Sequence, residues 1–359
     1  MTNWWDTGRQ YRRLVEVSSG DYERFDRPVE IDLSSTIQRP RLTEIDEAGN
    51  IRDRAVNLQL DGETLIFLLK GTTPANTTRL YHLYYDEGTE ADDVPSAPAL
   101  VALTADIDHE GFSSYRIATQ NATYYYHQQG AGFASMIDID GNDWINFHPW
   151  GGSDGNYRGI PNVAHPESHF HPGRDGCTSE IAFAGPLKVT IHSRSNDDKW
   201  ACQWEIYPAH ARLTVLKVDH PYWFLYEGTP GGILDEAGDY MVRSDGTRIP
   251  ASERWESALP APEWIYFGAA NTERVLYLIH HEADDKIDSY WPMEHNMTVF
   301  GFGRNGIEKF MTHTPAHFTI GFAESGQFAL ARQTINAAYQ PVETTVGEVE
   351  TNPASRQAN

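Results

Sequence analysis

The chain has 359 residues, and its 51 acidic against 28 basic side chains give a net charge of −23 at pH 7. Such a charge repels nucleic acid and anionic membrane, so neither is expected as a partner. The two cysteines, Cys177 and Cys202, are too few for a disulfide framework, and the sequence leaves open whether they pair.

No stretch of eighteen apolar residues is present, which argues against a membrane-spanning helix. The first residues, MTNWWDTGRQYRR, lack the apolar centre of a secretory signal. The location is therefore open between two alternatives. The protein is secreted or periplasmic if a signal peptide was removed, and cytoplasmic otherwise.

Short runs of alternating apolar and polar residues follow one another along the chain, separated by Gly, Asp, Asn or Pro. Helical periodicity is not sustained anywhere, and one or two helical turns are expected at 251–259. The pattern predicts an all-β protein. The clearest strands are expected at 64–69, 79–85, 122–128, 187–195, 211–218 and 274–282.

The segment 87–105 is first acidic and then rich in Pro and Ala, has no strand pattern, and predicts a domain boundary. Residues 1–100 are expected to form a small N-terminal β-sandwich. Residues 106–338 are expected to form a larger β-sandwich that carries the functional site. From Val342 the chain is polar and free of aromatic residues, so 339–359 is expected to be a flexible tail.

Two neighbouring loops concentrate side chains that suit sugar chemistry. The first, 148–162, is rich in Gly, Asn and Asp and contains Tyr157 and Arg158. An aromatic ring can stack on a sugar, and an arginine can bind a carboxylate through two parallel hydrogen bonds. The alternative is that the aromatic residues of this loop only close one end of a sandwich.

The second loop, HPESHFHPG (165–173), holds three histidines within seven residues. If the segment is extended, His169 and His171 point to the same face, because side chains alternate along a strand. Together with His165 they are predicted to act in catalysis or to bind a divalent metal, zinc or calcium. The alternative is that these histidines form only local hydrogen bonds.

Two later segments add candidates. In DHPYWFLYEGTPGG (219–232), alternation places Tyr222 and Glu227 on opposite faces of a strand, and both are candidate catalytic residues. Glu227 ends the strand beside aromatic residues and would suit a general acid with a raised pKa. In RVLYLIHHE (274–282), His281 is a further candidate metal ligand if the fold brings it to the first histidine cluster.

The segment GAGFASMIDIDGNDWINF (130–147) combines a glycine pair, a strand of small residues and a tight turn within D-x-D-G-N-D-W. In this it resembles the opening hairpin of galactose-mutarotase-like β-supersandwiches, a fold of sugar epimerases and of domains in polysaccharide lyases and glycoside hydrolases. The resemblance implies a β-supersandwich in the larger domain. By position, it also implies His169 or His171 as general base and Glu324 as catalytic carboxylate.

The motifs of nucleotide binding, of α/β-hydrolases and of HExxH proteases are absent from the sequence. The histidine, tyrosine and arginine candidates lie close together, whereas the carboxylates are scattered. This distribution favours a polysaccharide lyase that cleaves a uronic-acid-containing glycan by β-elimination. The alternatives are a glycoside hydrolase with a carboxylate pair, and a non-catalytic sugar-binding or mutarotase-like protein. The expected partner in each case is a poly- or oligosaccharide.

Overall fold

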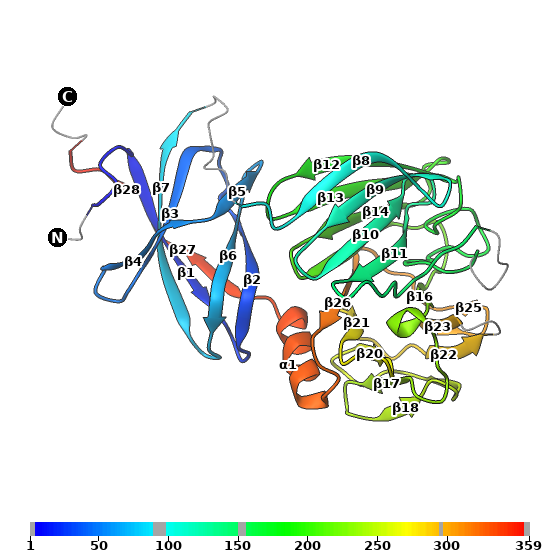
Figure 1. The fold of residues 1–359 in the computed structure, drawn as a ribbon. Coiled ribbons are helices and arrows are strands. Elements are labelled where there is room, and N and C mark those ends of the chain that lie inside the picture. The colour runs from blue at the N-terminus through cyan, green and yellow to red at the C-terminus, as the bar shows by residue number, and fades with distance from the viewer. Residues whose placement is uncertain (1–3, 89–97, 150–155, 294–296, 355–359) are drawn as a thin grey trace. The chain divides into compact units, whose positions relative to one another are not determined.

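The computed structural model describes residues 4–88, 98–149, 156–293 and 297–354. The chain is an all-β protein, as the sequence predicts. It divides into two compact units (Figure 1). Unit 1 comprises Met1–Ala99, Gly185–Leu187 and Gln340–Asn359, and unit 2 comprises Leu100–Ala184 and Lys188–Tyr339.

Unit 1 contains two antiparallel sheets with strand orders β27-β1-β7-β3-β4, where β28 also pairs with β1, and β2-β6-β5. One apolar cluster joins side chains from both sheets, including Val15, Val29, Phe67 and Tyr81, so the unit is a β-sandwich. Its strands are β1 (Tyr11–Ser18), β2 (Arg24–Asp32), β3 (Ile37–Ile45), β4 (Ile51–Val56), β5 (Leu58–Asp61), β6 (Thr64–Thr73), β7 (Thr78–Glu87), β27 (Glu343–Val346) and β28 (Glu350–Thr351).

The end of the chain differs from the expected flexible tail, because within 339–359 both β27 and β28 pair with β1. Arg12, which is 1% exposed, donates a hydrogen bond from Nη2 to Glu350 Oε2 over 2.6 Å. The side-chain amide of Asn352 donates to the carbonyl of Arg9 over 2.8 Å. The polar composition was misleading, because an edge strand needs few apolar residues when its backbone is paired.

Truncation after Gln340 is expected to lower the free energy of unfolding of unit 1 by at least about 2 kcal/mol, because Arg12 loses its carboxylate partner and β1 its edge strand. Differential scanning calorimetry measures the effect. Truncation after Ala354 keeps β27 and β28 and serves as the control. Equal melting temperatures for the two truncated proteins would contradict a structural role of these strands.

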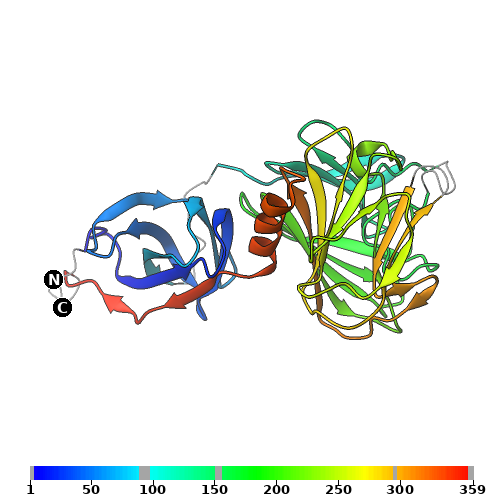
Figure 2. The same ribbon diagram turned by 90° about the horizontal axis from the view of Figure 1, so that it is seen from below.

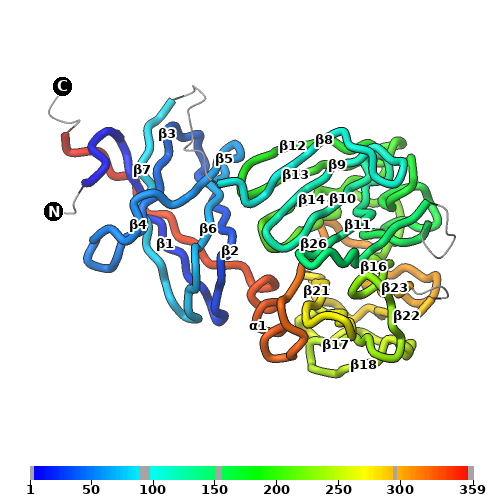
Figure 3. Tube along the Cα trace, in the orientation of Figure 1, coloured from blue at the N-terminus to red at the C-terminus, as the bar shows by residue number. Residues whose placement is uncertain are grey.

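Unit 2 is built on a nine-stranded antiparallel sheet with the order β12-β13-β14-β15-β26-β21-β20-β17-β18. In the chain trace, β26 lies beside β21, although a long segment of sequence separates them (Figure 3). The strands of this sheet are β12 (Cys177–Ala184), β13 (Val189–Ser195), β14 (Ala201–Ile206), β15 (His210–Lys217), β17 (Tyr240–Arg243), β18 (Arg248–Pro250), β20 (Trp264–Gly268), β21 (Val275–His280) and β26 (Ala316–Ala323).

Two four-stranded sheets, β11-β10-β9-β8 and β16-β23-β22-β19, and the small pair β24-β25 complete the strands of unit 2. One core cluster contains Phe133, Trp204 and Phe300, which come from the three larger sheets. Their shared core makes unit 2 a large multi-sheet sandwich. The strands are β8 (Ala102–His109), β9 (Phe112–Ala118), β10 (Ala122–His127), β11 (Gly132–Asp138), β16 (Phe224–Gly228), β19 (Trp255–Ser257), β22 (Asp288–Met293), β23 (Met297–Phe302), β24 (Arg304–Asn305) and β25 (Glu308–Lys309).

Unit 2 also contains helix α1 (Phe328–Tyr339), which lies against β21 and β26 (Figure 2), and the short 3-10 helix η2 (Pro230–Gly232). The sequence did not predict α1, whose buried apolar residues are Ala331, Ile335 and Ala338. This spacing of i, i+4 and i+7 is helical, but two of the three residues are small. In the described part of the chain, no helix has the length and apolar character needed to cross a bilayer.

The segment 251–259, expected to form helical turns, contains strand β19 instead. β19 pairs with β22 as the outer strand of its sheet, and this pairing overrides the weak helical pattern. Cys177 and Cys202 are both buried free thiols, which answers the question that the sequence left open.

Candidate active site

The candidate site of unit 2 begins where the loop after residue 156 meets strand β16. Gly159 and Glu227 exchange two backbone hydrogen bonds of 2.8 and 3.1 Å, and Ile160 bridges to Phe133 of β11. Gly159 is required here by close packing, since a Cβ atom would lie 2.4 Å from Pro172 Cδ. These contacts bring the two loops singled out in the sequence to the end of β16.

Glu227 is the centre of this site, and only 6% of the residue is exposed. The side-chain amide of Asn162 donates to Glu227 Oε2 over 2.7 Å. Nε2 of the buried His171 lies 3.5 Å from the same carboxylate oxygen. The predicted residues His171 and Glu227, separated widely in sequence, are therefore neighbours in the structure.

The proton on His171 is positioned by the backbone. Its Nδ1 lies 2.6 Å from the carbonyl oxygen of Pro172 and donates to it, because a carbonyl can only accept. In a neutral ring, Nε2 then carries a lone pair and lies 3.5 Å from Glu227 Oε2, so the two groups attract each other only when one of them carries a proton. Within the described residues, His171 Nε2 and Asn162 Oδ1 make no hydrogen bond, so each is a buried acceptor without a donor.

The aromatic ring of Trp223 forms a second part of the site, with two cations beside it. The Arg304 guanidinium carbon and Lys309 Nζ lie 5.8 and 5.1 Å from the ring centroid. His165 stacks on the same ring at 6.3 Å with an interplanar angle of 20°. Cations over an aromatic face are attracted by its quadrupole, and here they place positive charge in a strongly acidic protein.

Burial changes the protonation behaviour of this second group. Desolvation lowers the pKa of His165, although the charge of Glu227 opposes the effect. Desolvation also lowers the pKa of Arg304 and of Lys309, and Glu227 and Glu167 respectively counteract it. The half-buried His165 is therefore held mainly as the neutral imidazole near pH 7, the form that accepts a proton.

Of the two candidates in the first loop, Tyr157 belongs to the site and Arg158 supports it. Tyr157 is 39% exposed, and its ring lies edge-on to His165 at 6.4 Å. Arg158 is 4% exposed, and its Nη1 donates to the carbonyl of Asn146 over 3.1 Å. Arg158, which was predicted to bind a substrate carboxylate, is thus buried and stabilises the loop through a backbone carbonyl.

His169 does not share the face of His171, contrary to the expected alternation. Phe170 adopts a positive φ of 50° and buries its ring completely, so the segment is bent rather than extended. His169 Nε2 lies 3.7 Å from Glu167, which also accepts a hydrogen bond from His220 over 2.6 Å.

The remaining candidates, Tyr222 and His281, have other partners. The hydroxyl of the buried Tyr222 donates to the carbonyl of His313 over 2.8 Å. His281 Nε2 lies 2.8 Å from Thr319 Oγ1, and its ring stacks on Tyr339. The four histidines predicted as metal ligands, His165, His169, His171 and His281, are not brought together, because the bend at Phe170 and the packing of His281 separate them.

Sequence reasoning missed Asn162, Arg304 and Lys309. Asn162 is the last residue of the loop that was singled out, and its contact with Glu227 left no local pattern in the sequence. Arg304 lies in GFGRNG (301–306), where closely spaced glycines around one arginine were the only available signal.

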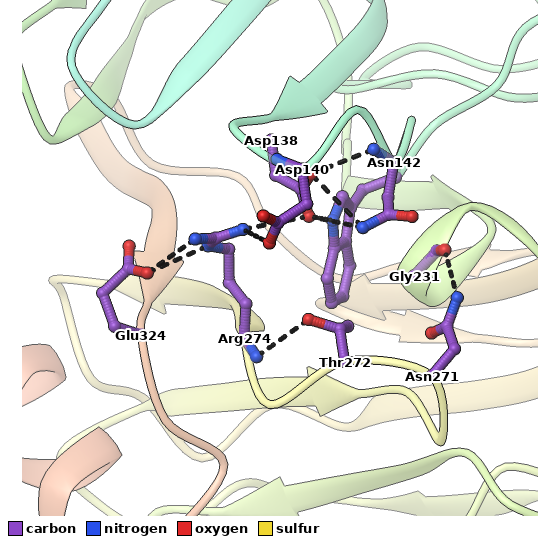
Figure 4. A network of polar contacts seen from close by, with 9 residues as sticks. Asp138, Asp140, Asn142, Gly231, Asn271, Thr272, Arg274 and Glu324 are labelled. Atoms are coloured by element: carbon purple, nitrogen blue, oxygen red, sulfur yellow. Dashed lines mark hydrogen bonds and ion pairs between the residues drawn. The ribbon is translucent and has the colours of Figure 1, made fainter.

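The D-x-D-G-N-D-W motif has a structural role in unit 2, because its aspartates pair with Arg274 (Figure 4). Arg274 Nη1 lies 3.3 Å from Asp138 and 2.7 Å from Asp140, and Nη2 lies 2.7 Å from Glu324. Asp138, fully buried, also accepts a hydrogen bond from Trp144 Nε1 over 3.0 Å. Glu324, implied by the resemblance as the catalytic carboxylate, is thus engaged by this arginine network.

A separate hollow of about 460 Å³ in unit 2 is lined by Tyr240, Arg248, Tyr266, Phe328 and neighbouring residues. It contains none of the residues gathered around Glu227. The convergence of a buried carboxylate, two imidazoles and two cations makes the Glu227 region the stronger candidate for chemistry.

No protein-family model and no curated protein sequence matches this chain. Among solved structures, the protein HI1317 aligns with a TM-score of 0.44 and 12% identity over 64% of this chain and 98% of its own. A galactose mutarotase related enzyme from Lactobacillus acidophilus aligns with a TM-score of 0.40 and 10% identity, over 60% of this chain and 98% of its own. The alpha-galactosidase from Lactobacillus brevis aligns with a TM-score of 0.39 and 9% identity, over 67% of this chain and 42% of its own. At these scores, the function has to be argued from the site itself.

Proposed function

We propose that the protein is a carbohydrate-active enzyme, and that the Glu227 site cleaves a uronic-acid-containing glycan by β-elimination. The observation that carries this proposal is the grouping of a neutral, half-buried His165 with Arg304 and Lys309 on Trp223, next to the buried Glu227–His171 pair. A lyase needs positive charge to neutralise the substrate carboxylate and a base to remove the neighbouring proton. This group contains two cations and a neutral imidazole, which supports the proposal.

The reaction assigns a role to each side chain. Lys309 stabilises the uronate carboxylate and the enolate-like charge that develops on it, and the buried Arg304 adds positive charge from within the fold, while His165 accepts the proton from C5. The C4–O bond then breaks, a double bond forms between C4 and C5, and the leaving oxygen takes a proton from the exposed hydroxyl of Tyr157. Glu227, His171 and Asn162 bind and orient sugar hydroxyls.

The overall charge of the chain strengthens the case for a local cationic subsite. With a net charge of −23, the general field repels an anionic polymer, so affinity has to come from cations at the site. A glycoside hydrolase has less support, because it uses two carboxyl groups that flank the scissile bond. Among the described residues, the side chains found in polar contact with Glu227 are an amide and an imidazole.

The test is to incubate the protein with a panel of acidic polysaccharides and to follow the ultraviolet absorbance of unsaturated uronate ends. A rise in absorbance with one of them is the expected result. New reducing ends without this absorbance would mean hydrolysis. Sugar binding without any cleavage would identify a binding or mutarotase-like protein, and either result would overturn the proposed elimination.

Of the two histidines that the sequence places together, only His171 is expected to matter for turnover. His171→Ala should lower kcat/KM by about 10²-fold, because the buried acceptor next to Glu227 is lost. His169→Ala should change kcat/KM by less than about threefold, since His169 contacts Glu167 rather than Glu227. Steady-state kinetics gives kcat/KM for both variants. Equal losses of kcat/KM would contradict the prediction and mean that the two residues act as one unit.

The pH dependence should reflect the lowered pKa of His165. The neutral ring is the active base, so kcat/KM should fall only as the pH drops below the usual histidine value of about 6.5. A His165→Ala variant should lose this acid limb along with most of its activity. An acid limb above the usual histidine range would rule out His165 as the base.

A further inference from the structure

A second group of histidines and carboxylates lies at the end of strand β21, and the proposed function does not use it. His280, the last residue of β21, is 1% exposed and stacks on Phe318 with ring centroids 5.0 Å apart. Its Nδ1 lies 2.5 Å from Oε2 of Glu263, which is also 1% exposed. The second oxygen of Glu263 accepts the backbone N–H of Asp284 over 2.7 Å.

This arrangement determines which nitrogen of His280 is available. With Nδ1–H donating to the Glu263 carboxylate, a neutral ring carries its lone pair on Nε2. Nε2 is buried, makes no hydrogen bond within the described residues, and lies 3.8 Å from Glu282 Oε2. A buried imidazole nitrogen without a hydrogen bond indicates a ligand, because an unsatisfied buried polar atom costs free energy.

A third potential ligand reaches the same point from a different segment. His313 lies shortly after β25, and its backbone carbonyl is fixed by the hydroxyl of Tyr222 at 2.8 Å. One ligand atom each from His280, Glu282 and His313 all lie within 4.8 Å of one another. Three ligands of this kind, two imidazoles and one carboxylate, form a set that zinc accepts, with the fourth position open to water.

We propose that His280 Nε2, Glu282 and His313 form a zinc-binding site, with Glu263 as the carboxylate that orients His280. Donation from a ligating histidine to a carboxylate is the usual arrangement around protein-bound zinc. Two ligands of one tetrahedral ion lie roughly 3.3 Å apart, so His280 and Glu282 need to approach each other by only about 0.5 Å. The exposed His313 can adjust to complete the site.

Hydrogen bonding at Glu282 is consistent with a metal ligand. Glu282 Oε1 lies 2.5 Å from His317 Nδ1, and Oε2 accepts the backbone N–H of His317 over 2.8 Å. Oε2 keeps a second lone pair and lies 3.8 Å from His280 Nε2. His317 thus orients the Glu282 carboxylate, as the hydrogen-bonding partner of a metal ligand does.

The position of the site indicates a structural role for the metal. The segment from Arg304 to His313 carries Lys309 and is held at Met311 by a backbone pair with Tyr222. A zinc ion bound to His313 would fasten the far end of this segment to β21. The competing explanation is that His280 is held between Glu263 and Glu282 without a metal, and the zinc titration decides between the two.

The experiment uses the full chain, purified without a histidine tag, stripped with a chelator and then titrated with ZnCl2 alone. Calorimetry and elemental analysis should give one equivalent of bound zinc, and the melting temperature should rise on loading. His313→Gln and Glu263→Gln should each weaken zinc binding by at least about tenfold. His313 is exposed, so its replacement should not disturb folding.

The matched control is His281→Gln, since His281 is adjacent in sequence but contacts Thr319 and Tyr339. This variant and Glu227→Gln should both bind zinc as the wild type does, which separates this inference from the proposed function. Less than about a tenth of an equivalent of zinc on the loaded wild type would overturn the proposal. So would unchanged affinity in His313→Gln, or loss of binding in a His165→Ala/His171→Ala variant.

Discussion

Glu227→Gln is expected to lower kcat/KM on the acidic polysaccharide by about 10³-fold while the protein remains folded. Glutamine has the same shape as glutamate but cannot share a proton with His171 or accept from Asn162 with a charged oxygen. Most of the loss should appear in kcat, because misorientation of the bound sugar slows the reaction more than it weakens binding. Initial rates from ultraviolet absorbance give both constants.

The matched control is Glu324→Gln. The resemblance to mutarotase-like proteins implies this residue as the catalytic carboxylate, whereas the structure pairs it with Arg274 at 2.7 Å and leaves its side chain 62% exposed. Activity within about threefold of wild type is expected, since exposed ion pairs contribute little. If Glu324→Gln lost activity and Glu227→Gln retained it, the site would have to be reassigned to the Arg274 network.

Arg274→Ala is expected to lower the free energy of unfolding of unit 2 by about 3 kcal/mol, because it leaves the carboxylate of Asp138 buried without its cation. Arg274 is itself 5% exposed, and it connects the 138–144 turn to β26 through Glu324 (Figure 4). Equilibrium denaturation followed by tryptophan fluorescence measures the change. The tryptophans of unit 2, including Trp144 beside Asp138, report on this region.

Asp140→Asn provides the control for Arg274→Ala. The side chain of Asp140 is 63% exposed, so its ion pair with Arg274 should contribute less than about 1 kcal/mol. A similar loss of stability in both variants would show that surface charge, rather than the buried Asp138, determines the effect. The double variant Arg274→Ala/Asp140→Asn is expected to be as stable as Arg274→Ala alone, because the two residues share one network.

Local periodicity in the sequence was sufficient for the fold class and for many strands. The runs at 64–69, 79–85 and 211–218 fall within β6, β7 and β15 or extend one residue beyond. This works because a strand with one buried face has to alternate, and alternation is visible over a few residues. It failed for β27, whose residues Glu343–Val346 are hardly buried, so the pairing with β1 left no apolar pattern.

The sequence also singled out His165, His171, Tyr157 and Glu227, since loops rich in histidine and aromatic residues are unusual. Tertiary structure decided which of these histidines lie close together. The left-handed backbone at Phe170 turns His169 away from His171, and only the burial of the Phe170 ring in the core explains that bend.

The partners of these side chains were decided by tertiary structure alone. Arg304 and Lys309 reach Trp223, and His313 reaches His280, across contacts between strands that are far apart along the chain. The sequence by itself determined the all-β class and a set of reactive side chains, because both follow from local composition and spacing. Strand order and register determined which of those side chains meet, since a one-residue change of register moves a side chain to the opposite face of its sheet.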